Sequence, residues 1–155
     1  MKYAFGLLFF LVISFSNAQE VKVLSWKAFN KEILKPTEKT KIINFWATWC
    51  GPCIQELPSF EEINSEMNDS VEVILVSLDN PARFEDKLLP FIAKKQLRSR
   101  VVLLDEVDFN SWMPKISTEW GGEIPATYII NGDKTAFHAG QLTKEQIISL
   151  ILKTK

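Results

Sequence analysis

Two cysteines in the spacing C-x-x-C, Cys50 and Cys53, constrain this chain more than any other feature, and they are its only cysteines. An apolar run with strand character, residues 41–46, precedes them, and a stretch with helical character, residues 53–63, follows. A cysteine at a helix N-terminus faces unpaired backbone N–H groups and the positive end of the helix dipole, which lower its pKa to about 3.5–7.5. Pro52 suits the first helical turn, where a missing N–H leaves no bond unmade. The pattern therefore predicts a strand, a redox-active dithiol and a helix, in that order.

The residues around the cysteines resemble those of a known family. The letters WCGPC at residues 49–53 are similar to the thioredoxin active-site motif, and the longer run NFWATWC at residues 44–50 resembles the TlpA/ResA branch of that superfamily. Pro58 is similar to the proline that kinks the thioredoxin active-site helix. The letters EIPAT at residues 123–127 resemble the cis-proline loop, which lies against the cysteine pair in that fold. The resemblance implies an α/β thioredoxin fold: a central mixed β-sheet flanked by helices, with an N-terminal extension.

The chain departs from thioredoxin at Asn44, where thioredoxins carry a buried aspartate that transfers protons. Glu56 instead resembles the glutamate that ResA-like proteins place near the cysteine pair. On a helix, Glu56 lies one turn beyond Cys53, and helical side chains lean toward the N-terminus. We expect Glu56 to exchange protons with Cys53 as the disulfide opens and closes. The alternative is an ordinary solvated carboxylate on the helix surface.

The resemblance implies a role for each residue near the motif. Cys50, expected to be the more exposed cysteine, is the nucleophile that attacks a substrate disulfide, and Cys53 resolves the mixed disulfide. Ile124 precedes a proline that the resemblance makes cis, which brings its backbone within strand-pairing reach of a substrate peptide. Trp49 is expected to be a partly exposed contact surface, whereas Trp46 belongs to the core. The expected substrate-binding residues are Trp49, Gly51, Pro52, Ile124 and Pro125.

Other functions of the two cysteines fit the sequence less well than redox chemistry does. A purely structural disulfide would close a very short loop and remove little chain entropy. A closed zinc site needs four ligands, and the chain offers no third cysteine and one histidine, His138. We therefore expect no metal and no organic cofactor beyond the cysteine pair. A copper-binding protein using Cys50, Cys53 and His138, and a disulfide oxidase or isomerase, remain the alternatives.

Composition sets broad limits on the rest. The 155 residues are enough for one domain with a sizeable core, and 46% hydrophobic content is ordinary for a globular protein. A formal net charge of −1 gives no case for nucleic acid as a partner. We expect a monomer.

The first residues have the pattern of an export signal. Lys2 precedes an apolar run over residues 3–15, and residues 16–18 end in the small residue that a signal peptidase selects. We expect a signal peptide at residues 1–18 and a thioredoxin-like domain at residues 19–155. An uncleaved N-terminal membrane anchor is the alternative, although the run is shorter than the ~20 residues of a spanning helix.

The remaining chain alternates strand and helix patterns, which predicts a mixed sheet with a closing Asn-Gly hairpin. The expected strands cover residues 20–24, 42–46, 71–78, 101–104, 126–130 and 135–139. The expected helices cover residues 26–34, the stretch from the cysteine pair to about residue 67, residues 84–96 with an interruption before Pro90, residues 108–118 with a break at Pro114, and a last helix that opens with a capping box at Thr143. Asp79 begins a connection.

TlpA/ResA-like proteins act mainly as reductants in the bacterial cell envelope, some of them on the haem-binding cysteines of apocytochrome c. The resemblance therefore implies a periplasmic thiol-disulfide oxidoreductase that reduces disulfide-bearing proteins. Each turnover requires an electron donor, for which a membrane or envelope thiol reductase is expected.

Overall fold

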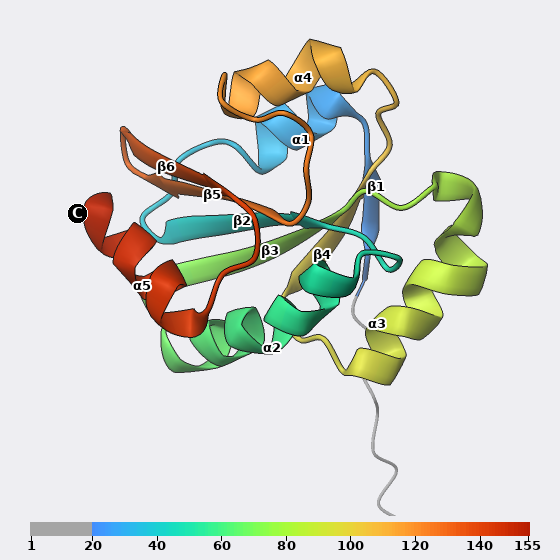
Figure 1. Cartoon of the computed structure of the whole chain (residues 1–155), viewed down its shortest axis with the longest axis horizontal. Coiled ribbons are helices and arrows are strands. Elements are labelled where there is room, and N and C mark those ends of the chain that lie inside the picture. The colour runs from blue at the N-terminus through green and yellow to red at the C-terminus, as the bar shows by residue number, and fades with distance from the viewer. Residues whose placement is uncertain (1–19) are drawn as a thin grey trace, which may run out of the picture.

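The computed structural model describes residues 20–155, which form helices packed on both faces of one six-stranded sheet (Figure 1). The expected signal peptide, residues 1–18, lies outside the described residues. The strands are β1 (Lys22–Leu24), β2 (Thr40–Trp46), β3 (Val71–Ser77), β4 (Arg100–Leu104), β5 (Ala126–Asn131) and β6 (Lys134–Ala139). The helical segments are α1 (Trp26–Glu32), α2 (Gly51–Glu66), the 3₁₀ turn η1 (Pro81–Arg83), the π-helical turn η2 (Phe84–Leu88), α3 (Leu89–Lys95), α4 (Phe109–Ile116) and α5 (Lys144–Lys153).

The sheet is mixed, as the strand and helix pattern predicts. Its strand order is β1-β4-β3-β2-β5-β6. The first four strands in this order are parallel, whereas β5 runs antiparallel to β2 and pairs with β6 in a hairpin. The carboxyl ends of β2, β3 and β4 therefore meet at one edge of the sheet, where loops from different parts of the chain come together.

Each face of the sheet carries its own core, because successive residues of a strand point to opposite sides. In β2, Ile42 belongs to the core under α2, α3 and α5, and the next residue, Ile43, belongs to the core under α1 and α4. Figure 1 shows α1 and α4 above the sheet and α2 and α5 below it. Every residue of β2 is buried. The strand that leads to the cysteines is thus buried on both faces and lies inside the sheet, between β3 and β5.

Local signals at the helix ends agree with the sequence. The Ser25 side chain accepts a hydrogen bond from the backbone N–H of Ala28 and caps α1. Thr143 and Gln146 form the predicted capping box of α5.

Among residues 20–155, no helix has the length and apolar content needed to cross a membrane.

One helix prediction needs correction, and another is confirmed. The predicted break at Pro114 is wrong, because α4 continues through this residue to Ile116. Near the end of so short a helix the proline removes a single backbone bond, and the burial of Trp112 and Ile116 against the sheet holds the helix together. The interruption before Pro90 takes the form of the π-helical turn η2, and Pro90 then lies in the first turn of α3.

Candidate active site

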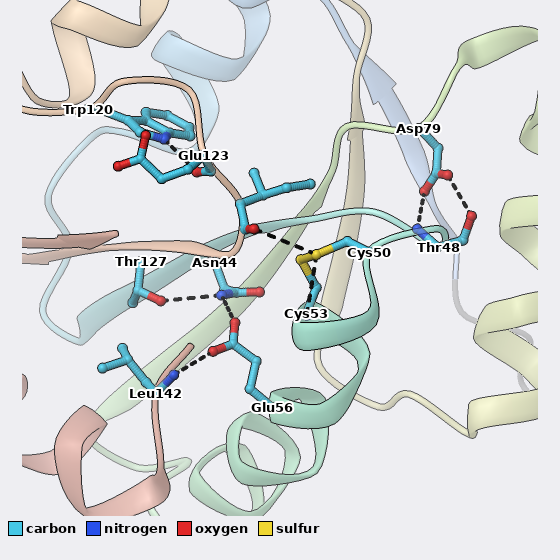
Figure 2. Close-up of a disulfide and its surroundings, with 11 residues drawn as sticks. Asn44, Thr48, Cys50, Cys53, Glu56, Asp79, Trp120, Glu123, Thr127 and Leu142 are labelled. Carbon is cyan, nitrogen blue, oxygen red and sulfur yellow. Dashed lines mark hydrogen bonds between the residues drawn. A yellow bond between two sulfur atoms is a disulfide. The ribbon is translucent and has the colours of Figure 1, made fainter. Parts of the chain in front are cut away.

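The cysteine pair lies where β2 ends and α2 begins, at the carboxyl edge of the sheet (Figure 2). Cys50 is the N-cap of α2 and is joined to Cys53 by a disulfide. The backbone N–H of Cys53 points at Cys50 Sγ, 3.3 Å away. Cys50 is 6% exposed and Cys53 is fully buried, so the predicted order of exposure is confirmed. When the disulfide opens, the sulfur of Cys50 lies where the helix start favours a thiolate.

The cis-proline loop packs against the same sulfur atom. The Ile124–Pro125 peptide bond is cis, as the resemblance implies. The Ile124 carbonyl oxygen lies 3.7 Å from Cys50 Sγ (Figure 2). The loop is braced by a hydrogen bond of 2.8 Å from the Trp120 indole N–H to the Glu123 carbonyl oxygen. The sequence motif at residues 123–127 and the cysteine motif therefore form one site, although Cys50 and Ile124 are 74 positions apart in the sequence.

Glu56 is buried, with 1% of its surface exposed, so the solvated alternative is wrong. Its carboxylate accepts a hydrogen bond of 2.7 Å from Asn44 Nδ2 and one of 2.8 Å from the backbone N–H of Leu142. Burial raises the pKa of Glu56 to about 7, against the opposing effect of these two hydrogen bonds. A carboxyl group with this pKa gains and loses a proton near neutral pH.

Asn44 links this carboxylate to the neighbouring strand. Its Nδ2 also lies 3.2 Å from Thr127 Oγ1 on β5, and the register pairs the two residues across the sheet. Its Oδ1 is buried and has no hydrogen-bond partner among residues 20–155. In the view of Figure 2, the Asn44 amide lies between the Glu56 carboxylate and the cysteine pair.

A second buried carboxylate, Asp79, was missed by the sequence analysis, which placed it at the start of a connection. It is 3% exposed and follows β3, the parallel neighbour of β2. It accepts hydrogen bonds from the Thr48 backbone N–H (3.0 Å), Thr48 Oγ1 (2.6 Å) and Ser77 Oγ (2.8 Å). These bonds fix the turn that carries the cysteines (Figure 2). The available signal was an aspartate directly after a buried parallel strand, at the edge where such strands end.

The remaining predicted residues are placed as follows. Trp49 is 64% exposed and Trp46 is fully buried, as predicted. Pro52 lies in the first turn of α2, and Gly51 begins that helix with open space around its Cα atom. His138 lies on β6, paired with Thr127 in the sheet register. Within the described part of the chain, no three histidine, cysteine or acidic side chains come together in a way that could hold a metal ion.

Comparisons with known proteins agree with this geometry. The profile of the family described as Thioredoxin matches residues 20–89. The chain is 31% identical to the thioredoxin-like protein YneN of Bacillus subtilis (strain 168) over 111 residues, which are 70% of this chain and 61% of that protein. It is 28% identical to the sporulation thiol-disulfide oxidoreductase A of the same organism, over 68% of this chain and 62% of that one. The chain thus spans about three fifths of the length of these two relatives.

Solved structures show the same fold. The crystal structure of a thioredoxin-related protein from Neisseria meningitidis serogroup B superimposes with a TM-score of 0.67 at 18% identity, covering 79% of this chain and 89% of that one. The motif, the cis-proline loop, the sheet order and these comparisons lead to one conclusion. The chain has the thioredoxin fold, and the residues of its site resemble those of the TlpA/ResA branch of the thioredoxin superfamily.

Proposed function

We propose that the protein is a thiol-disulfide oxidoreductase that reduces disulfides of other proteins in the cell envelope. The observation that carries this proposal is the Cys50–Cys53 disulfide at the N-terminus of α2, with the cis-proline loop against Cys50 Sγ. The relative named as a thiol-disulfide oxidoreductase supports the reaction class.

The reaction exchanges two electrons between two sulfur pairs. The Cys50 thiolate attacks one sulfur of the substrate disulfide, forms a mixed disulfide and releases the other sulfur as a thiolate. Cys53 loses its proton and attacks Cys50 Sγ. This step closes the Cys50–Cys53 disulfide and releases the second substrate sulfur, which takes up a proton as a thiol. The substrate is reduced by two electrons and the protein is oxidised, so the sulfur pair itself carries the electrons and the reaction calls on no metal or organic cofactor.

Glu56 is the proposed acceptor of the Cys53 proton. Cys53 and Glu56 are both buried and are three residues apart on α2, so their side chains occupy the same helix face. With a pKa of about 7, the Glu56 carboxylate is basic enough to take a proton and acidic enough to return it. Asn44 holds the carboxylate on this face through the bond from Nδ2.

The role of Glu56 is tested by the Glu56→Gln variant. We expect the pH profile of thiol alkylation in the reduced protein to change, because glutamine cannot exchange the proton. Glu62→Gln, on the exposed side of the same helix, is the matched control and should keep the wild-type profile. A Glu56→Gln profile that overlays the wild-type profile would exclude the proton-transfer role.

The direction of the reaction is tested by the reduction potential of the Cys50–Cys53 pair in defined thiol buffers. Glycine and proline between the cysteines match thioredoxin, whose potential is about −270 mV, against about −120 mV for DsbA. We expect a value near that of thioredoxin. A value near that of DsbA would overturn the reductant proposal and favour an oxidase or isomerase.

We place this activity outside the cytoplasm, with residues 1–18 as the signal peptide and a membrane or envelope thiol reductase as electron donor. The test is the N-terminal sequence of the protein recovered from the cell envelope. A mature chain that starts at Gln19 supports cleaved export. A chain that keeps residues 1–18 at the membrane indicates the uncleaved anchor instead, and a full chain in the cytoplasm contradicts export.

A further inference from the structure

A groove with a volume of about 350 Å³ lies beside the cysteine pair, at the edge where β3 and β4 end. One wall is Trp49, the residue immediately before Cys50. Val107 from the segment that joins β4 to α4 and Phe109, the first residue of α4, also line the groove. Leu78 and Pro81, which follow β3, complete the lining. None of the contacts in the redox mechanism above uses this groove.

The groove gathers apolar surface that the fold leaves uncovered. Val107 is 83% exposed, Trp49 is 64% exposed and Phe109 is 43% exposed. These are three of the five large hydrophobic side chains that are exposed among residues 20–155, and all three line the same groove. Single exposed apolar residues are normal, but a cluster bordered by polar groups marks an interaction site.

The polar border of the groove is acidic. Asp105 and Glu106 line it, and the groove has no lysine or arginine among its described lining residues. Asp79 also lines the groove, but its carboxylate is already held by Thr48 and Ser77. The sequence has a formal net charge of only −1, so this acidity is local to the groove. An occupant that complements it carries positive charge next to an apolar side chain.

The position of the groove relates it to the reacting sulfur. Trp49 lines the groove and is the residue next to Cys50, and adjacent Cα atoms are 3.8 Å apart, so the groove begins beside the reacting cysteine. The Ile124 carbonyl oxygen, which does not line the groove, lies 3.7 Å from Cys50 Sγ. A peptide joined to Cys50 through a mixed disulfide would therefore have its neighbouring residues within reach of the groove.

We infer that this groove binds the segment next to the reactive cysteine of the protein substrate, and that it selects an apolar side chain accompanied by lysine or arginine. This inference rests on the proposed function, since it names the class of substrate that the Cys50–Cys53 pair acts on. Trp49, Val107 and Phe109 contact the apolar side chain, and Asp105 and Glu106 attract the cation.

The test uses two peptides, each with one internal disulfide, that differ only beside the first cysteine: Leu-Lys in one and Leu-Glu in the other. We expect the reduced protein to reduce the Leu-Lys peptide with a kcat/KM about tenfold higher, since each exposed charge pair contributes up to about 1 kcal/mol. The preference should shrink in high salt. Equal rates for the two peptides would overturn the inference.

Variants locate the preference in the groove. The double substitution Asp105→Asn with Glu106→Gln should bring the ratio of the two peptide rates to within about twofold. The ratio is compared within each variant, so a general loss of activity cancels. The double substitution Glu38→Gln with Asp69→Asn removes the same charge from exposed positions before β2 and β3, away from the carboxyl edge, and should keep the wild-type ratio. A ratio that survives the groove substitutions contradicts the assignment.

Two further measurements test the proposed function apart from the groove, and test whether a second copy of the chain occupies the groove instead of a substrate. Reduction of a small neutral disulfide, bis(2-hydroxyethyl) disulfide, tests the proposed function alone; if it fails while the protein is fully reduced, the function is wrong regardless of the groove. Sedimentation of the wild type and of Val107→Ser tests self-association. A dimer that Val107→Ser abolishes would assign the groove to a second copy and overturn the substrate assignment, whereas a monomer at all concentrations supports it.

Discussion

Two buried carboxylates lie on either side of the cysteine motif, and they are held in different ways. Asp79 accepts three hydrogen bonds, all from Thr48 and Ser77, which lie beside it at the ends of β2 and β3. Glu56 accepts two, and these come from distant elements, Asn44 on β2 and Leu142 before α5. Asp79 ties one turn to one strand, whereas Glu56 sits among three separate segments of the chain.

The difference indicates a division of work. The bonds of Asp79 converge on the turn that presents the cysteines, so this carboxylate positions the site. The bonds of Glu56 do not offset the effect of burial, and its pKa rises to about 7. A carboxylate that must hold a loop benefits from many donors, and one that must exchange a proton benefits from few.

The largest effect is expected from Asp79→Ala. The substitution leaves the buried Thr48 N–H and two hydroxyl groups without their acceptor, which should lower the free energy of unfolding by about 3–4 kcal/mol. Urea unfolding of the oxidised protein measures this loss. The matched control Asp69→Ala removes an exposed aspartate and should change stability by no more than about 0.5 kcal/mol. A loss as small as that of the control would show that Asp79 does not hold the turn.

Glu56→Gln should have a smaller effect that depends on pH. The folded protein binds a proton at Glu56 with a pKa of about 7, whereas the ordinary pKa of a glutamate carboxyl group is 4.5. The folded state therefore binds more protons between these pH values, and the contribution of Glu56 to stability is full below 4.5 and lost as the pH rises through 7. Relative to Glu56→Gln, the wild type should lose up to about 3 kcal/mol between pH 4.5 and pH 8. Unfolding of both proteins across this range measures the difference, and a constant difference would contradict the raised pKa.

Thr48→Val should have the smallest effect of the three. It removes the 2.6 Å hydrogen bond from Thr48 Oγ1 but keeps the bond from its backbone N–H. A hydrogen bond to a charged group contributes about 1.5–3 kcal/mol, and we expect a loss at the lower end of this range because the carboxylate keeps two donors. Combining Thr48→Val with Asp79→Ala should cost less than the sum of the two single losses. Strict additivity would mean that the two side chains act independently.

Much of the site could be predicted from the sequence because its signals are local. The cysteine spacing, Pro52 in the first helical turn and Glu56 on the face of Cys53 all follow from residues that are adjacent or one helical turn apart. The capping box at Thr143 and the hairpin after β5 are local in the same sense. The cis state of the bond before Pro125 came from family resemblance, since X–Pro bonds are cis in only about 5–6% of cases in folded proteins.

The contacts that were missed depend on the register of the sheet. Thr48 and Asp79 are 31 residues apart and meet because Trp46 pairs with Ser77 where β2 and β3 end. The bond from Leu142 to Glu56 spans 86 residues. In a single sequence, an aspartate at the end of a strand and a leucine before a helix look like ordinary turn residues. The continuation of α4 through Pro114 was missed for a related reason, because tertiary burial of Trp112 and Ile116 outweighs a local helix breaker.

The hydrogen bonds of Asn44 have a thermodynamic consequence. One amide contacts both Glu56, whose pKa is raised, and Thr127, two residues beyond Pro125 in the loop that packs against Cys50. Linkage between two binding events is reciprocal. If proton binding at Glu56 changes the affinity for the substrate by some factor, substrate binding changes the affinity for that proton by the same factor. Measuring the pKa of Glu56 with and without a bound peptide would therefore report the same coupling free energy as measuring peptide affinity at two pH values. Asn44 cannot titrate, but through its two contacts it would couple proton binding at Glu56 to the binding of the proposed polypeptide substrate.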